Sequence, residues 1–165
     1  MIKVSNINFR NQTREDMPFL KELYIESRRA EVDLLEGWSE EQKFDFLGNQ
    51  FIAQIQYYLT QFKNAWFQVI EDLDQKPIGR LYLDERTNEI RIIDILISGS
   101  KRNKGIGTQI FLAILERGRK KNLPVRIHVE KNNPARSLYD RLGFQIIEDR
   151  GVYYLMEFPP RNDVK

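Results

Sequence analysis

The sequence predicts a mixed α/β fold in which helices pack on one central sheet. Before residue 65, apolar residues recur every three or four positions in two segments, which is typical of amphipathic helices. From Ala65 onward the apolar period shortens, and strand-like runs alternate with further helical segments. The 165 residues, 41% of them hydrophobic, suit about one domain, so we expect a single domain over residues 1–165.

The N-terminal third is predicted to hold one strand and two helices. Apolar alternation at the start of the chain indicates an opening strand that ends near Gln12. The Thr13 hydroxyl can accept a backbone N–H at a helix start, which favours a first helix over residues 14–28. Ser39, followed three residues later by Gln42, has the capping-box pattern and opens a second, longer helix.

Three strands are predicted in the middle of the chain, at residues 66–70, 78–83 and 89–97. A turn around Pro77 joins the first two strands. The third run is nearly continuously apolar, which indicates a strand buried on both faces.

The C-terminal part alternates helix and strand. A helix is expected from Ile106 onward, after a loop that contains glycines. Asn133 as cap and Pro134 in the first turn predict a short helix over residues 134–142, which Gly143 ends. With a turn at 149–151, the remaining predicted strands cover residues 125–129, 144–147 and 152–158.

Composition excludes several function classes. A formal net charge of +2 argues against nonspecific nucleic-acid binding, which needs a strongly basic face. With no cysteine and a single histidine, His128, neither disulfides nor a metal site are expected. No apolar run approaches the roughly 20 residues of a membrane span, and the first residues lack the layout of a secretion signal. We therefore expect a cytoplasmic protein that does not enter membranes.

The segment from Ile97 to Thr108 is the most informative in the chain. It leaves an apolar strand and enters a helix, where unpaired backbone N–H groups and the positive end of the helix dipole favour phosphate. Gly105 and Gly107 lack side chains, so a ligand can approach the main chain closely. Neither the P-loop nor the dinucleotide-binding fingerprint matches this spacing. A solvated basic turn is the alternative explanation for the segment, whose cations are Lys101, Arg102 and Lys104.

Two motifs resemble the GNAT superfamily of acyl-CoA-dependent N-acetyltransferases. The run Arg102-Asn103-Lys104-Gly105-Ile106-Gly107 matches the family's Arg/Gln-x-x-Gly-x-Gly/Ala pattern. About thirty residues further on, the run from Asn132 to Phe144 matches Asn-x-x-Ala-x-x-Leu-Tyr-x-x-x-Gly-Phe. The predicted order of elements agrees with the family over nearly the whole chain.

The resemblance implies a mostly antiparallel mixed sheet with one splayed parallel strand pair. Acetyl-CoA, the acyl donor, would lie in the gap between those strands and meet the backbone of Ile95 and Ile97. Asn132 would bond near the cofactor, although a turn or cap role stays open, and Arg136 would reach the nucleotide end. The pyrophosphate would be held by backbone N–H groups of Arg102, Asn103, Lys104, Gly105, Ile106, Gly107 and Thr108.

The resemblance also implies where the proton-transfer groups lie. Tyr139 matches the family's tyrosine, and a phenol with a pKa near 10 can protonate the leaving thiolate. The alternative is that Tyr139 only packs and orients the thioester. Glu89 and Asp94, in the strand beside the gap, are candidate bases, but Asp94 could equally pair with an arginine for structure. His128 is a third candidate, on the polar face of its strand.

Residues 26–45 hold seven acidic and three basic side chains, a net charge of −4. In the family this part overhangs the acceptor pocket, so Glu31, Asp33 and Trp38 are predicted to bind a cationic amine. His128, on the polar face of the strand at 125–129, is predicted to line the same site. Solvated helix ends explain the same acids as well. The acceptor stays open among peptide N-termini, lysine side chains, aminoglycosides, polyamines and amino acids.

The sequence thus predicts an N-acetyltransferase that moves the acetyl group of acetyl-CoA to a primary amine by direct attack in a ternary complex. Two alternatives have no catalytic function. One is an acyl-CoA-binding sensor, and the other is a protein-interaction module that forms a homodimer through residues 152–158.

Overall fold

The computed structural model describes residues 2–160, and its centre is one seven-stranded sheet in the order β1-β2-β3-β4-β5-β7-β6. All neighbouring strands are antiparallel except β4 and β5, which are parallel. The predicted mixed α/β fold is therefore confirmed. The strands are β1 (Ile7–Asn11), β2 (Trp66–Asp72), β3 (Pro77–Glu85), β4 (Ile90–Ile97), β5 (Val125–Glu130), β6 (Gln145–Arg150) and β7 (Tyr153–Phe158).

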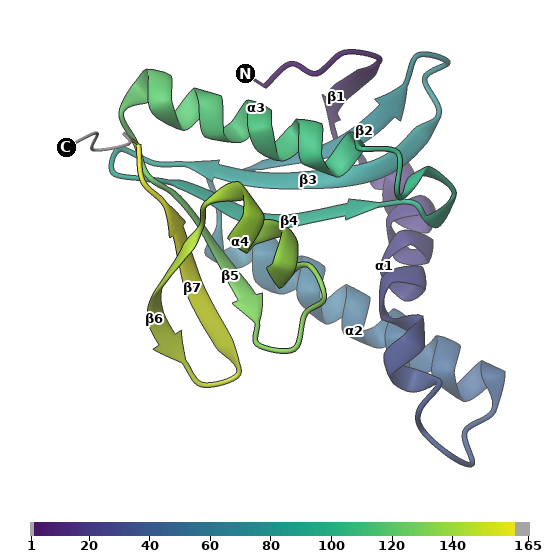
Figure 1. Ribbon diagram of the computed structural model, residues 1–165. Coiled ribbons are helices and arrows are strands. Elements are labelled where there is room, and N and C mark those ends of the chain that lie inside the picture. The colour runs from purple at the N-terminus through teal and green to yellow at the C-terminus, as the bar shows by residue number, and fades with distance from the viewer. Residues whose placement is uncertain (1, 161–165) are drawn as a thin grey trace.

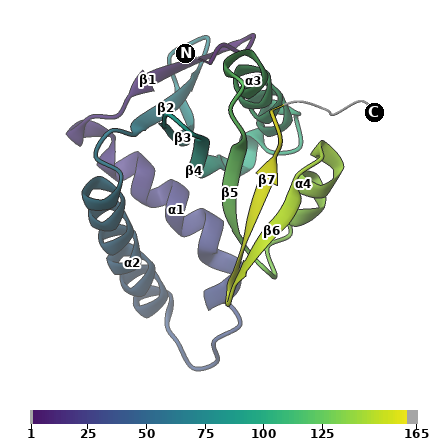
Figure 2. The same cartoon turned by 90° about the vertical axis from the view of Figure 1, so that its left-hand side faces the viewer.

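Helices cover both faces of the sheet (Figures 1 and 2). One face packs against α3 and α4 around the larger hydrophobic core, and the other packs against α1 and α2 around a smaller, aromatic core. No helix within residues 2–160 is long and apolar enough to cross a membrane. The helices are α1 (Met17–Val32), α2 (Glu40–Gln61), α3 (Ile106–Lys121) and α4 (Arg136–Leu142), with short 3-10 turns η1 (Arg14–Asp16) and η2 (Gly99–Lys101).

The first helix differs from its predicted range of 14–28. A 3-10 turn occupies residues 14–16, and α1 then runs four residues further than predicted, to Val32. Val32 is buried, so tertiary packing lengthens the helix beyond its last obvious apolar repeat. The opening strand is also shorter than the apolar alternation indicated, because it is limited to the five residues that pair with β2.

The predicted capping box of α2 is confirmed. The Gln42 backbone N–H donates to the Ser39 hydroxyl at 3.1 Å, and the Ser39 N–H donates to the Gln42 side-chain oxygen at 2.9 Å. These two bonds satisfy donors that a helix start otherwise leaves unpaired.

Helix α4 begins two residues later than predicted. Asn133 does form a turn, because its side-chain oxygen accepts from the Ala135 N–H at 2.9 Å, but the helix proper starts at Arg136. The predicted stop is confirmed, since Gly143 ends the helix with φ +101°, a conformation that favours glycine. The following strand extends to Arg150, which moves the predicted turn to residues 151–152.

Strands β4 and β5 pair only over their first residues. Their parallel register runs from Ile90 opposite Val125 to Ile92 opposite Ile127, whereas β4 continues to Ile97 in antiparallel contact with β3. A bulge at Ile93 shifts the β3–β4 register at the same point. We call the parting of the two strands beyond these pairs the β4–β5 gap. Because of it, the C-terminal half of β4 is half-buried rather than buried on both faces as predicted.

Candidate active site

The loop at the end of β4 leads into an open helix start. Gly105 is the N-cap of α3 with φ +78°, and within residues 2–160 no side chain caps this helix. A Cβ added at Gly105 or Gly107 would meet nothing within 4 Å. The first N–H groups of α3 are therefore accessible to an anion, at the positive end of the helix dipole. The predicted phosphate-loop residues follow one another here, and Arg102 is exposed and donates to the Ile97 carbonyl at 2.9 Å.

Tyr139 lies on α4, on the α3 face of the sheet. Its ring packs against Phe111 and Phe144 at centroid distances of 5.3 and 5.9 Å, and the residue is only 5% exposed. Burial raises the pKa of Tyr139 to about 12, and the charge of Asp94 adds to the effect. The phenol therefore keeps its proton at neutral pH and stays a hydrogen-bond donor.

Asp94 lies on the opposite face of the sheet, bound to an arginine of the neighbouring strand. The Nε of Arg80 donates to Asp94 at 2.7 Å, its NH2 group contacts the same carboxylate, and NH2 also donates to Gln54 at 2.7 Å. Arg80 is fully buried, whereas the Asp94 side chain is 21% exposed. The arginine pairing considered as an alternative for Asp94 is therefore present, and the carboxylate still reaches solvent.

Glu89 does not lie at the β4–β5 gap. It precedes β4 and is therefore roughly 26 Å of strand from Ile97, at the end where β4 and β5 are still paired. Its buried carboxylate contacts Arg86 at 2.8 Å, Arg91 at 3.0 Å and Arg126 at 3.3 Å. Glu89 thus lies at the centre of an ion cluster with three arginines, at the paired end of the two strands, and its role as a base stays a prediction.

His128 lies beside the point where β4 and β5 part, between two guanidinium groups. Arg91 is 3.1 Å from its Nδ1, and Arg150 is 2.7 Å from its Nε2. Burial, together with the charges of both arginines, lowers the pKa of His128, so the ring is neutral at pH 7. A neutral imidazole has one acceptor nitrogen, and a guanidinium group already faces each ring nitrogen. His128 therefore lies near the gap, but its acceptor nitrogen already faces a guanidinium group and has no free lone pair for a substrate proton.

The predicted acceptor-binding acids separate into two groups. Glu31 pairs with Arg28 on α1, next to the sheet. Asp33 pairs with Arg29 and Lys43, each at 3.1 Å, on the link between α1 and α2. Figure 1 places this link at the far end of α1 from η1, away from the sheet.

Trp38, on the same link, packs edge-on against Phe46 at a centroid distance of 5.3 Å. Together with Gln42 and Asp45 they line a shallow hollow of about 290 Å³. The structure therefore brings Glu31 and His128 to the face of the gap that α1 and α2 cover, but neither Asp33 nor Trp38.

Asn132 and Arg136 follow β5. Asn132 is exposed, next to the turn that Asn133 forms. Arg136 donates to the Lys131 carbonyl at 3.0 Å, and its guanidinium lies 4.9 Å from the centre of the Tyr154 ring. In this structure Arg136 binds the carbonyl of its own loop, and its contact with the nucleotide end of the cofactor stays a prediction.

The sequence reasoning missed several polar residues around Asp94. Arg80 binds Asp94 directly, and burial together with the charge of Asp94 raises the pKa of Tyr58. Arg28 and Glu130 lie on the same face, 3.3 Å apart. One signal was readable: Arg80 interrupts an otherwise apolar strand, as Asp94 does in the next strand, and two such interruptions can pair.

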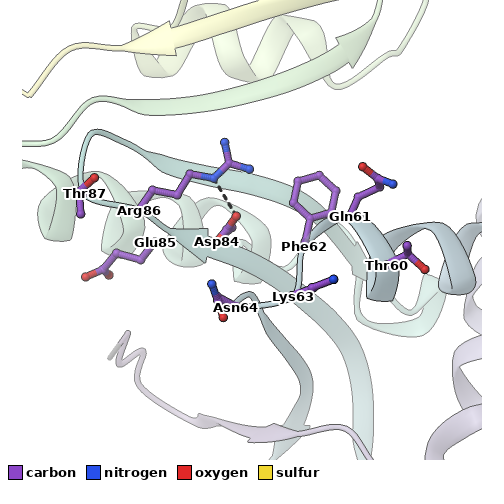
Figure 3. Close-up of a pocket in the computed structure, with 9 residues that line it drawn as sticks. All are labelled: Thr60, Gln61, Phe62, Lys63, Asn64, Asp84, Glu85, Arg86 and Thr87. Carbon is purple, nitrogen blue, oxygen red and sulfur yellow. Dashed lines mark hydrogen bonds and ion pairs between the residues drawn. The ribbon is translucent and has the colours of Figure 1, made fainter.

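A second hollow, of about 520 Å³, lies at the C-terminal end of α2, beside the β3–β4 turn (Figure 3). In it Arg86 reaches Asp84 at 2.8 Å and lies over the Phe62 ring. None of the predicted site residues lines it, and it adjoins the end of β4 farthest from the gap. No group of three or more potential metal ligands occurs within residues 2–160.

A parallel strand pair that parts beside an open, glycine-bearing helix start defines the fold class of acyl-CoA-dependent acetyltransferases. The model of the acetyltransferase (GNAT) family matches residues 18–144, which is more than half of the chain. The protein therefore belongs to the GNAT family, as its two sequence motifs indicated. No curated protein matches the chain significantly.

Solved structures of acetyltransferases share the fold. A PaiA N-acetyltransferase from Thermoplasma acidophilum in complex with coenzyme A is 21% identical, with a TM-score of 0.67 over 93% of this chain and 98% of that one. A spermidine N-acetyltransferase from Vibrio cholerae in complex with CoA and spermine is 20% identical, with a TM-score of 0.61 over 95% and 97%. An acetyltransferase from Thermus thermophilus is 19% identical, with a TM-score of 0.65 over 96% and 99%. At these identities the likeness shows the fold alone.

Proposed function

We propose that the protein transfers the acetyl group of acetyl-CoA to a primary amine by direct attack in a ternary complex. One observation carries the proposal. Asp94 stands in β4 beyond the last pair with β5 and binds Arg80 on the α1–α2 face of the sheet, whereas Tyr139 belongs to the core on the opposite face. Burial, to which the charge of Asp94 adds, raises the pKa of Tyr139, so a proton donor and a solvent-reaching carboxylate belong to the two faces that meet at the β4–β5 gap. This pairing of an acid and a base across one space is what acyl transfer to an amine requires.

The residues present fit acetyl-CoA as the acyl donor. Open space at Gly105 and Gly107 and the uncapped start of α3 suit a pyrophosphate, and Lys101, Arg102 and Lys104 add positive charge. The other predicted phosphate-binding N–H groups belong to Asn103, Ile106 and Thr108. Beyond Ile92, β4 has no β5 partner, so the backbone at Ile95 and Ile97 is available to the pantetheine arm. The cofactor supplies the reactive thioester.

The proposed step needs two proton transfers. The amine nitrogen bonds to the thioester carbon, and the C–S bond then breaks. Tyr139 gives its phenolic proton to the departing sulfur. The nitrogen loses its proton to Asp94, directly or through one water, and proton exchange with solvent then restores both side chains. Holding both reactants in the gap contributes to the rate by removing the entropic cost of their encounter.

Arg80 is the positioning residue for Asp94 in this scheme. Two of its nitrogens contact the carboxylate, and its third, NH1, is buried without a protein partner. A fixed carboxylate orientation favours proton transfer from an amine that enters from the α1–α2 face. We further propose that the enzyme works in the cytoplasm as one domain over residues 1–165.

Calorimetric titration with acetyl-CoA tests the proposal first, with adenosine 3′,5′-bisphosphate as the control ligand. We expect saturable binding that the acyl-pantetheine part tightens, followed by thiol release when amines are added. Binding without turnover on any amine would favour an acyl-CoA sensor. Absence of binding by the folded protein would favour a protein-interaction module, such as a homodimer through residues 152–158.

A further inference from the structure

On the face of the sheet that α1 and α2 cover, the Arg28 side chain lies among two carboxylates and an aromatic ring. Its NH1 group donates to Glu31 at 3.0 Å and to Glu130 at 3.3 Å. Its guanidinium carbon is 5.9 Å from the centre of the Tyr24 ring. We call Tyr24, Glu31 and Glu130 the Arg28 box.

The box is suited to a cation. It holds two negative charges, and the face of an aromatic ring attracts positive charge as well. Burial opposes the charge on Arg28, but Glu31 and Glu130 outweigh it and raise the pKa of this arginine. If Arg28 moved away, a net charge of about −2 would remain beside the ring.

The box adjoins the acceptor side of the β4–β5 gap. Glu130 is the last residue of β5, three residues beyond the final β4–β5 pair at Ile127. The charges of Arg28 and Asp94 both act on the hydroxyls of Tyr24 and Tyr58, so the box and Asp94 flank the same aromatic side chains. A molecule whose amine lies at Asp94 can therefore extend toward Arg28 along these rings.

The ion pairs of Arg28 are partly exposed to solvent, so another cation can replace the guanidinium group. Its side chain is 30% exposed, and those of Glu31 and Glu130 are 62% and 26% exposed. Ion pairs that water reaches contribute little net stability, because solvent screens them. Arginine also has a long flexible stem, so its head can leave while the stem stays packed. An incoming ammonium group can replace the guanidinium at small cost.

We propose that the acceptor is an α,ω-diamine or longer polyamine, and that its second ammonium group displaces Arg28 from the box. This inference rests on the proposed function, because the first amine must react at the gap. An acceptor with a carboxylate at the far end would meet Glu31 and Glu130 and be repelled. An uncharged tail would gain nothing from either carboxylate.

Thiol release from acetyl-CoA tests the inference with three length-matched acceptor series: alkylamines, α,ω-diamines and ω-amino acids. We expect kcat/KM to be about tenfold higher for the best diamine than for its matched alkylamine, the effect of two partly exposed charge contacts. Glu130→Gln should lower kcat/KM for the diamine about fivefold, the most that one such contact commonly contributes. Arg28→Gln should raise it, because the internal competitor is gone. Both effects are read from the ratio of kcat/KM for the diamine to kcat/KM for its matched alkylamine, because an alkylamine has no second ammonium group.

Arg29→Gln is the matched control. It removes the same charge from the same helix, but Arg29 pairs with Asp33 and Glu40. It should leave the ratio of diamine to alkylamine unchanged. Calorimetry of diamine binding to the protein–CoA complex gives a readout that does not depend on turnover, and a thermal melt of each variant checks folding.

The outcomes separate the inference from the proposed function. Equal kcat/KM for diamines and alkylamines, or weaker diamine binding by Arg28→Gln, would overturn the inference alone. Preference for ω-amino acids would do the same and make Arg28 a carboxylate contact. Binding of CoA without turnover on any amine would overturn the proposed function and the inference with it.

Discussion

Tyr139 is held in place by apolar rings. Phe111 and Phe144 pack against it, and both belong to the larger core, so the phenol is rigid as well as buried. A rigid donor with a raised pKa keeps its proton at neutral pH and needs little reorganisation to donate it, which suits the proposed protonation of the sulfur. The same burial makes the ring part of the core, so a test of its chemistry must preserve its packing.

Tyr139→Phe meets that requirement, since it removes only the hydroxyl. We expect kcat to fall roughly 10²-fold, the usual contribution of a general acid, with the affinity for acetyl-CoA unchanged. Steady-state rates and calorimetry measure the two quantities. Tyr57→Phe, on the exposed face of α2, is the matched control. Full activity of the Tyr139 variant would leave this side chain with a packing role only.

The pH dependence of the wild-type rate provides an independent check on the same residue. Because burial and Asp94 raise the pKa of Tyr139 to about 12, the phenol stays protonated as the pH rises through the ordinary tyrosine value near 10. We therefore expect no alkaline loss of kcat up to roughly pH 10. A fall in kcat with a midpoint below pH 10 that is absent in Tyr139→Phe would show that the pKa of Tyr139 is not raised.

Arg80 and Asp94 form an ion pair, and removal of either partner alone leaves the other charge without its counterion. Asp94→Ala leaves the fully buried Arg80 charge without its carboxylate, which should cost about 3 kcal/mol of stability. Replacing Arg80 with methionine in the same protein should recover part of that loss, since both charges are then absent. Urea unfolding of the single and double variants measures the difference. A double variant less stable than Asp94→Ala would mean that Arg80 stabilises the fold through Gln54 and Tyr82 instead.

Candidate residues could be selected from the sequence where a local motif or a break in a pattern marked them. Tyr139 stands inside a run with fixed spacing, and Asp94 is a carboxylate in an apolar strand. Glu130 and Arg28 are 102 residues apart in the sequence, and no local pattern predicts their contact. The distance of Glu89 from the gap was not predictable for a related reason: the sequence places Glu89 at the start of a strand, but it does not show at which end of that strand the neighbouring strand parts from it.

At the scale of elements, the helix and strand types were predicted well and their ends less well. Ser39 and Gly143 mark helix ends through their own backbone and side-chain chemistry, which acts within a few residues. The ends of α1 and β1 depend instead on what packs or pairs with them, and those partners are distant in sequence. The start of α4 differs because Asn133 caps a turn that precedes the helix.

Gly107 allows the helix start to be tested separately from its ligand. A Cβ there meets nothing, so Gly107→Ala should leave the stability equal or up to about 0.5 kcal/mol higher, while the affinity for CoA falls. Gly118→Ala, later in the same helix, is the contrast, because its Cβ would lie 2.9 Å from the Leu123 carbonyl oxygen and from Val125. That variant should lose stability. Thermal unfolding and calorimetry measure the two effects, and unchanged CoA affinity in Gly107→Ala would remove this glycine from the binding surface.

At the scale of the whole molecule, one irregularity of the sheet lies between the two layers of helices. Strands β4 and β5 pair for three residues and then part, with α3 and α4 on one side and α1 and α2 on the other. Figure 2 shows α1 and α2 on one side of the sheet and α3 and α4 on the other. The alternation of helix and strand predicted the sheet, but the parting came from the family resemblance, because it is a property of two strands separated by a whole helix.

Access from two faces determines the expected kinetic order. If the donor enters beside α3 and the acceptor beside α1, both are bound when the amine attacks, and no acetyl group needs to rest on the protein. The chain has no cysteine that could carry such a group as a thioester. Initial rates measured over a grid of both substrates should therefore give double-reciprocal lines that intersect. Parallel lines would instead indicate a covalent intermediate and contradict direct attack. So would a protein mass that increases by one acetyl group with acetyl-CoA alone and returns to its first value when amine is added.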